Sequence, residues 1–382
     1  MPDISTMDGV AAADIGSIDG VAKANISTLG GVSVPASGAT QWGIGTKDAG
    51  VGYAASSDLT SWTAYEPVAS GVDLASSSQD FVNLTYGKDD SGNPLWALVW
   101  GNGTMEIIVN DDITDQDGWG VNHLGTTGNK QYAIAWGEDG SGGNQWISIG
   151  KFNSTRSLSW RSATGHSWSS VDMTGLSGWN YDKPVFGIAT DGAGTFMFPQ
   201  EDRIYRTVDG GANWTLAHDF NTVHYKLKNI VYTNSSWVVL GEDEEGADNT
   251  IYLACAASDV TDWTAYDSGI GTSVDVQFAA AAGTVICSNG SAWERFTVSG
   301  KTISSLTKHA TGLNNGPLPG FGNAGDVAGD GGGNWIIVGN AGDICTSTDD
   351  GVNFSQSVNG LAVEGTQVED IQAVAANVYL PL

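Results

Sequence analysis

The chain has 382 residues, a length that one domain reaches when it grows by repeated units. With 53 glycines and only 15% charged residues, the composition favours many short strands joined by tight turns over long helices. Its 15 Lys and Arg are outnumbered by 43 Asp and Glu, and the net charge of −28 excludes nucleic acid and an anionic membrane surface as expected partners.

Residues 3–35 are an 11-residue repeat with the units DISTMDGVAAA, DIGSIDGVAKA and NISTLGGVSVP. A glycine in every unit, with β-branched residues beside it, argues against a helix. Such a segment is too small to bury a core, so we expect residues 1–37 to dock on a partner or to bundle with sister copies. The apolar residues expected to make this attachment are Ile4, Ile15, Ile18, Val21, Ile26, Leu29 and Val32.

Residues 38–382 repeat a second, longer pattern. In each unit a β-rich run, a turn of Gly, Asn, Asp or Ser and another β-rich run lead to a turn that ends in an aromatic residue. The first strands are expected near residues 81, 131, 185, 229, 276, 326 and 370, about 45–53 residues apart as in propeller blades. Runs such as WVVLG and WIIVG are apolar throughout, which indicates sheets buried on both faces. The sequence therefore predicts an all-β fold, a seven-bladed β-propeller with an extended N-terminal arm.

Two further features indicate how the blades are held together. A tryptophan recurs after the first turn of several units, and we expect these flat side chains to wedge adjacent blades; they are Trp96, Trp146, Trp237 and Trp335. The C-terminal segment DIQAVAANVYL matches a first strand, whereas TQWGIGTKDAGVGYAASSDLTSW, near Trp42, matches the later strands. The two ends of the chain are therefore expected to complete one blade, which removes exposed sheet edges.

The segments TVDGGANW and STDDGVNF resemble the Asp box, S/T-x-D-x-G-x-x-W/F, of sialidases and BNR-repeat propellers. The resemblance implies a structural turn between the outer strands, in which the Asp carboxylate accepts backbone N–H groups, the Gly is left-handed and the aromatic ring packs beneath. The matching positions are Thr207, Asp209, Gly211 and Trp214, and Ser347, Asp349, Gly351 and Phe354. Weaker copies occur at Ser57, Asp58 and Trp62 and at Ser258, Asp259 and Trp263.

The same resemblance would imply an arginine triad in a sialidase. The arginines of this chain are Arg156, Arg161, Arg203, Arg206 and Arg295, of which the first four form two pairs in successive units. This distribution argues against sialidase activity. The basic patch of photosystem assembly propellers is also absent from the sequence.

The sequence offers few other candidates for a site. Trp119, Trp160 and Trp179 are the tryptophans expected at the surface, where they could stack on a sugar ring. The five histidines are scattered and none forms an HxH or HExxH spacing, so no metal or catalytic histidine site is expected.

No cofactor is expected, and the acidic run GEDEEGAD is the one candidate for calcium. Its acidic residues include Asp243, Glu244 and Asp248. The three cysteines, Cys255, Cys287 and Cys345, lie in strand-like runs and are interpreted as small buried apolar residues.

The I-x-x-I-x-G-V-A repeat of the arm resembles segments that open fibre and virion-surface proteins of tailed phages. The resemblance implies a structural protein of the fibre, spike or decoration type, anchored to other virion proteins by residues 1–37 and displaying the propeller for adhesion, with a host-surface glycan as candidate ligand. The start of the chain lacks the pattern of a secretion signal, so we expect synthesis in the host cytoplasm and assembly into the virion. A sialidase-like glycoside hydrolase and a protein-interaction propeller are the alternatives.

Overall fold

The computed structural model gives the arrangement of most of the chain. It describes residues 6–7, 10–11, 17–18, 21–22, 28–29, 32–33, 41–46, 50–55, 57–67, 81–100, 106–124, 130–153, 156–173, 175–180, 183, 185–220, 225–243, 249–271, 276–289, 292–309, 324–339, 342–363, 366–368 and 370–377. In this part of the chain no helix occurs, and no segment therefore has the form of a membrane-spanning helix.

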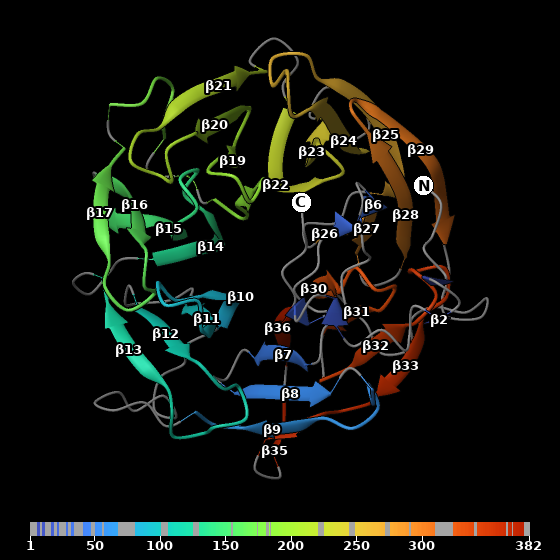
Figure 1. The fold of residues 1–382 in the computed structure, drawn as a ribbon. Helices are drawn as coiled ribbons and strands as arrows, with labels where there is room; N and C mark the ends of the chain where they lie inside the picture. The colour runs from blue at the N-terminus through green and yellow to red at the C-terminus, as the bar shows by residue number, and fades with distance from the viewer. Residues whose placement is uncertain are drawn as a thin grey trace.

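Seven four-stranded antiparallel sheets stand around a ring (Figure 1), which confirms the predicted seven-bladed β-propeller. The innermost strands are β10 (Phe81–Lys88), β14 (Lys130–Glu138), β18 (Ala189–Thr190), β22 (Tyr225–Thr233), β26 (Gln277–Ala281), β30 (Ala324–Gly329) and β36 (Ile371–Ala376). The second strands are β11 (Pro94–Trp100), β15 (Asn144–Asn153), β19 (Phe196–Gln200), β23 (Ser236–Asp243), β27 (Thr284–Ser288), β31 (Trp335–Gly339) and β7 (Gln41–Thr46).

The two outer layers complete each blade. The third strands are β12 (Glu106–Asn110), β16 (Arg156–Ser162), β20 (Arg203–Thr207), β24 (Asn249–Ala256), β28 (Trp293–Ser299), β32 (Ile344–Ser347) and β8 (Val51–Ala55). The outermost strands are β13 (Gly120–His123), β17 (Ser169–Asp172), β21 (Thr215–Asp219), β25 (Thr264–Gly271), β29 (Thr302–His309), β33 (Ser355–Val358) and β9 (Thr63–Tyr65). A short hairpin of β34 (Ala362–Val363) and β35 (Thr366–Gln367) precedes the last blade. We number the blades 1 to 7 in chain order, from β10–β13 to the closing blade β36-β7-β8-β9.

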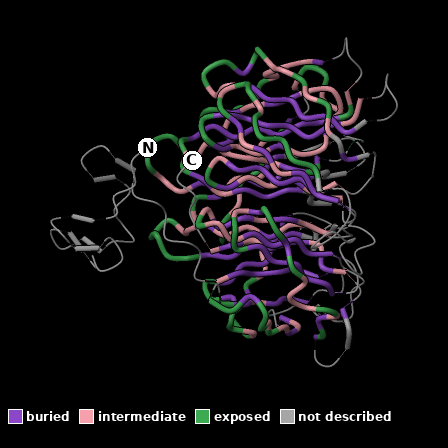
Figure 2. The backbone as a smooth tube through the Cα atoms, turned by 90° about the vertical axis from the view of Figure 1, so that its right-hand side faces the viewer, coloured by how far each residue is buried: buried purple, intermediate pink, exposed green. Residues whose placement is uncertain are grey.

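The core lies between the blades. Second strands such as β19, β27 and β31 are buried at every residue, whereas the outermost strands β17 and β33 are mostly exposed or half-buried (Figure 2). Seven clusters of buried apolar residues occur, and each joins two neighbouring blades. This explains the continuous apolar runs in the sequence: because each sheet is covered on both faces, its side chains cannot alternate between core and solvent.

The recurrent tryptophans occupy these interfaces. All lie on second strands, and the fully buried ones are Trp42, Trp96, Trp146, Trp237 and Trp335. Trp146 of blade 2 donates its indole N–H to the carbonyl oxygen of Lys88 in blade 1 at 2.8 Å. A side chain on Gly87 would collide with Trp146 and its neighbour Trp136, so the glycine leaves room for the ring. The predicted wedging role is confirmed.

The last strand closes the ring as predicted. β36 pairs antiparallel with β7, with Ala376 opposite Trp42 and Ile371 opposite Thr46. Beyond the paired strands, the backbone N–H of Gln41 donates to the side-chain oxygen of Asn377 at 2.8 Å, and the N–H of Asn377 donates to the carbonyl of Gln41 at 3.0 Å. Both ends of the propeller are therefore held in one sheet.

One first strand begins later than expected. The run VFGIAT predicts a strand near residue 185, but β18 begins at Ala189. Gly187 packs so closely against Asn229 of β22 that a Cβ atom would lie 1.7 Å from the side-chain oxygen. The first part of this run therefore packs against the neighbouring blade, and only its last part forms a strand.

Each unit of the arm contains one small antiparallel hairpin. The strands are β1 (Thr6–Met7) with β2 (Val10–Ala11), β3 (Ser17–Ile18) with β4 (Val21–Ala22), and β5 (Thr28–Leu29) with β6 (Val32–Ser33). The hairpins repeat every 11 residues, as the sequence does. Each is a separate two-stranded sheet among the described residues.

Candidate functional site

The turns after β20 and β32 are the best-defined polar features of the propeller. In the first, Asp209 accepts hydrogen bonds from the hydroxyl of Thr207 at 2.7 Å and the backbone N–H of Asn213 at 2.9 Å. Gly211 adopts a φ of 82°, and its N–H donates to the Thr207 hydroxyl at 3.1 Å. The ring of Trp214 is buried below the turn.

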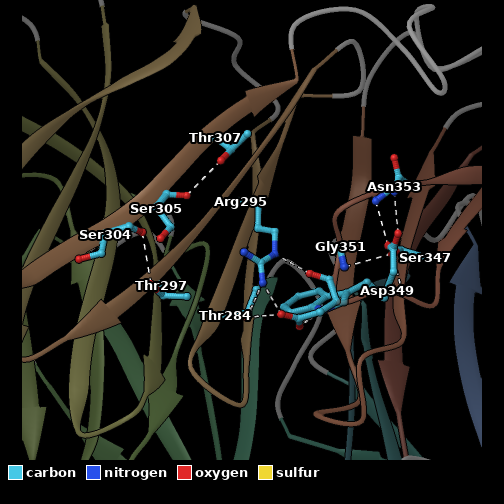
Figure 3. Close-up of polar contacts among 12 residues, drawn as sticks. Thr284, Arg295, Thr297, Ser304, Ser305, Thr307, Ser347, Asp349, Gly351 and Asn353 are labelled. Carbon is cyan, nitrogen blue, oxygen red and sulfur yellow. Dashed lines mark hydrogen bonds and ion pairs between the residues drawn. The ribbon is translucent and has the colours of Figure 1, made fainter.

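The second turn repeats these contacts. Asp349 accepts from the hydroxyl of Ser347 at 2.7 Å and from the N–H of Asn353 at 2.9 Å (Figure 3). Gly351 has a φ of 76°, and Phe354 is buried. Burial opposes ionisation of the Asp349 carboxyl, but the hydrogen bonds from Asn353 and Ser347 outweigh it, so its pKa lies below the ordinary value. A carboxylate saturated by its own turn stabilises the hairpin and is poorly suited to chemistry on a substrate.

Asp350, the residue after Asp349, connects blade 6 to blade 5. Asp350 accepts a hydrogen bond from the hydroxyl of Thr284 at 2.9 Å and forms an ion pair with the guanidinium of Arg295, both in blade 5 (Figure 3). The Nε of Arg295 also donates to the Asp350 carbonyl at 2.6 Å, and the indole of Trp335 donates to its carboxylate at 3.3 Å. Arg295 is thus part of an inter-blade contact.

The weaker copies form a different turn. Asp58 accepts from the N–H and hydroxyl of Thr60 at 3.0 and 2.6 Å, and Asp259 accepts from those of Thr261 at 3.1 and 2.6 Å. In each case the bonds span two residues, whereas Asp209 and Asp349 bond four residues ahead. The shared sequence D-[LV]-T therefore indicates a tighter turn of its own.

The tryptophans expected at the surface are mainly packing residues. Trp119 is only 2% exposed, and its indole donates to the hydroxyl of Tyr65 in blade 7 at 3.1 Å, so the expectation of an exposed ring is wrong. Trp160 is half-buried in the cluster between blades 1 and 2. Trp179 is half-buried and packs edge-on against Phe198 and Tyr205, with ring centroids 5.6 and 5.3 Å apart.

Phe186 is the exposed aromatic ring that sequence reasoning missed. It is 54% exposed, and the ammonium of Lys228 in β22 lies 5.8 Å from its ring centroid. Lys228 also forms an ion pair with Glu242 at 3.3 Å. Because Phe186 stands in an apolar strand-like run, its sequence context predicts burial and gives no signal of exposure.

Two described cations of blade 3, Arg203 and Lys183, form ion pairs with acids nearby. Arg203 lies 2.8 Å from Asp202 and 3.3 Å from Asp219, and Lys183 lies 2.9 Å from Glu201. Arg203 lies in β20 of blade 3 and Arg295 in β28 of blade 5, and each forms an ion pair with acids of its own surroundings. The side chain of Arg156 lies outside the described residues.

Asp326 is a carboxyl group in an unusual environment. It lies in β30, where its two oxygens accept the backbone N–H of Val374 in β36 at 3.0 Å and of Val327 at 2.8 Å. Burial raises its pKa to about 7, although both hydrogen bonds oppose the rise. The group therefore links blade 6 to the closing strand and is neutral below that pH.

Among the described residues, no three potential metal ligands gather in one place. Of the calcium candidates, Asp243 ends β23, and Glu244 and Asp248 lie outside the described residues. Of the attachment residues, Ile18, Val21, Leu29 and Val32 lie in the arm hairpins, and Ile4, Ile15 and Ile26 lie outside the described residues. The three cysteines are free and buried, as expected.

Comparison with known proteins gives distant neighbours. No family model and no curated protein matches the chain. YCF48 from Cyanidioschyzon merolae is similar with a TM-score of 0.51 and 13% identity over 72% of this chain and 84% of that chain. YCF48 bound to a D1 peptide gives a TM-score of 0.48 and 15% identity over 73% and 82%.

An ancestral GH74 enzyme gives a TM-score of 0.55 and 12% identity, covering 87% of this chain and 47% of that chain. This chain thus spans about half the length of the enzyme. At such identities the likeness shows the fold alone, and the chain is a seven-bladed β-propeller with distant propeller neighbours.

Proposed function

We propose that the protein is a structural component of a phage particle, of the fibre, spike or decoration type, which attaches through residues 1–37 and displays the propeller for adhesion to the host surface. The observation that carries the proposal is that three equivalent hairpins precede β7, the strand that closes the ring. An attachment element and a rigid display element are thus joined in one chain.

The position of β7 allows force on the arm to be passed to the propeller. Residues 34–40 link β6 to β7, and β7 is hydrogen-bonded to β36 on one side and to β8 on the other. A pull on the arm is therefore resisted by two antiparallel pairings. The resemblance of the arm repeat to virion-surface proteins supports the same role, and the charge of −28 opposes unspecific association of neighbouring particles.

The direct test is to look for the chain in purified virus particles by mass spectrometry and to locate it by antibody labelling. A variant lacking residues 1–37 serves as the matched control. The proposal predicts that the full chain is found on particles and that the shortened chain, still folded, is not. A full chain that stays entirely in the soluble fraction of the host lysate contradicts it.

The ligand of the displayed propeller is proposed to be a host-surface glycan. Phe186 supports this, since an exposed ring beside Lys228 offers a stacking face and a hydrogen-bond donor. A glycan array probed with the wild-type chain and with Phe186→Ala tests it. Binding that is lost in Phe186→Ala supports this surface, whereas equal binding by both proteins rules it out.

A further inference from the structure

The three arm hairpins place the same kinds of residue at the same register positions. The directly opposed pairs of larger apolar residues are Met7 with Val10, Ile18 with Val21, and Leu29 with Val32. The opposed pairs of small residues are Thr6 with Ala11, Ser17 with Ala22, and Thr28 with Ser33. Since opposed residues share one face of a sheet, the register places the larger apolar residues of each hairpin on one face and the small residues on the other.

The residues between the paired strands favour this geometry. They are Asp8-Gly9, Asp19-Gly20 and Gly30-Gly31, dipeptides typical of two-residue hairpin turns. The sequence thus specifies a hairpin in every unit.

A hairpin of this size needs a partner. A two-stranded sheet is marginal in water, and stability requires further strands or a packed apolar face. Each arm hairpin is its own two-stranded sheet, and none is hydrogen-bonded to a blade of the described propeller. A hairpin whose larger apolar residues share one face is therefore expected to be stabilised by packing that face against a partner.

We propose that the arms of two or more copies of this chain associate with one another, hairpin beside hairpin, with their apolar faces turned inward. The 11-residue period of the arm indicates the partner. Three apolar faces recur every 11 residues in one register, so a partner that covers all three must offer a surface with the same repeat. A second copy of the chain has that repeat by construction.

The negative charge of the chain opposes this assembly. Two of the three turns carry an aspartate, Asp8 and Asp19, and each chain has a net charge of −28. Copies side by side bring like charges together, and salt screens their repulsion. The assembly is therefore expected to tighten as salt is added.

The proposal does not depend on the virion role, and its test needs no virus. The full chain, of 39.7 kDa, is passed through size exclusion with light scattering, beside a triple variant Met7→Ser, Ile18→Ser and Leu29→Ser. The control carries changes on the other face, Thr6→Ser, Ser17→Thr and Thr28→Ser. We expect wild type and control to have the mass of several copies and the apolar-face variant that of one copy.

Near-ultraviolet circular dichroism shows whether the propeller is intact in each protein. A wild-type chain of single-copy mass, or an apolar-face variant that keeps the full mass, overturns the proposal. If the oligomer forms but the chain is absent from virus particles, the arm association stands and the proposed function fails.

A second experiment tests the register itself. A variant with two residues inserted after Ala13 and two after Ala24 changes the spacing between hairpins while keeping each hairpin. Copies of this variant share one spacing between hairpins, and this spacing differs from that of the wild type. We expect it to form oligomers of the wild-type mass and to be nearly excluded from mixed oligomers by native mass spectrometry. Free mixing with the wild type, or a variant of single-copy mass, contradicts register-matched association.

Discussion

Replacing Asp326 by asparagine changes the pH dependence of stability in a direction that the structure fixes. Burial raises the pKa of this carboxyl to about 7 from its ordinary value of 3.8. In the folded protein the group stays protonated to near neutral pH, whereas in the unfolded chain it ionises near pH 4. The folded state therefore binds more protons between about pH 4 and 7, so wild-type stability falls across this window and is level above it.

The size of the effect follows from the two pKa values. A difference of about three in pKa corresponds to roughly 4 kcal/mol, at about 1.4 kcal/mol for each factor of ten. An amide avoids this loss, but its NH₂ group must face one of two backbone donors, Val374 or Val327, which costs about 1–3 kcal/mol. We expect Asp326→Asn to be less stable than wild type near pH 4 and more stable near pH 8.

The assay is urea unfolding followed by tryptophan fluorescence at several pH values from 4 to 8. The quantity of interest is the difference in free energy of unfolding between variant and wild type. The control is Asp90→Asn, because Asp90 is exposed in a turn. A difference for Asp326→Asn that is as flat with pH as that of the control refutes the raised pKa of this carboxyl.

Four further predictions follow from the packing and the turns. Trp146→Ala is expected to cost about 3–5 kcal/mol of unfolding free energy, since the ring fills the interface of blades 1 and 2, and the half-buried Trp168→Ala should cost clearly less; denaturation midpoints decide this. Asp209→Ala and Asp349→Ala should each lower stability by about 1–2 kcal/mol and by similar amounts, because both carboxylates accept matching bonds; unequal losses in thermal unfolding would show that the two turns differ. A thiol reagent at pH 8 should label no cysteine in the native protein and three after unfolding, since burial raises the pKa of Cys255 and of Cys345 to about 12 and that of Cys287 still higher; fast labelling of native protein would contradict their burial. Removing residues 371–382 deletes β36 and should abolish cooperative thermal unfolding, and a truncated chain with an unchanged melting curve would show that closure is dispensable.

Much of the fold could be predicted because its causes are local or repeated. The apolar runs around Trp237 and Trp335 indicate sheets covered on both faces, and the match between the two chain ends predicts that the last strand pairs with the segment near Trp42, as β36 does with β7. The later start of β18 could not be predicted, because it depends on the approach of Gly187 to Asn229 in the next blade.

The exposure and environment of single side chains were harder to predict than the fold. Trp119 ends a polar turn and looks exposed in the sequence, but it is buried because Tyr65, far away along the chain, supplies a hydrogen-bond partner in the adjoining blade. Phe186 shows the reverse: its apolar neighbours predict burial, and its ring is exposed. Asp326 could not be identified either, since its environment is created by ring closure.

In the arm, the sequence indicates hairpins but does not show which of their faces is apolar. Its period was evident, and the dipeptides Asp8-Gly9 and Asp19-Gly20 favour hairpins. Which face of each hairpin is apolar follows only from the register, with Met7 opposite Val10.

Electron microscopy of the purified full chain tests the account most directly, because one image shows both the propeller and its attachment. The account predicts closed rings of seven blades, several of them joined through their arms at a common point. Isolated single rings under conditions that favour assembly, or rings of a different blade number, would contradict it.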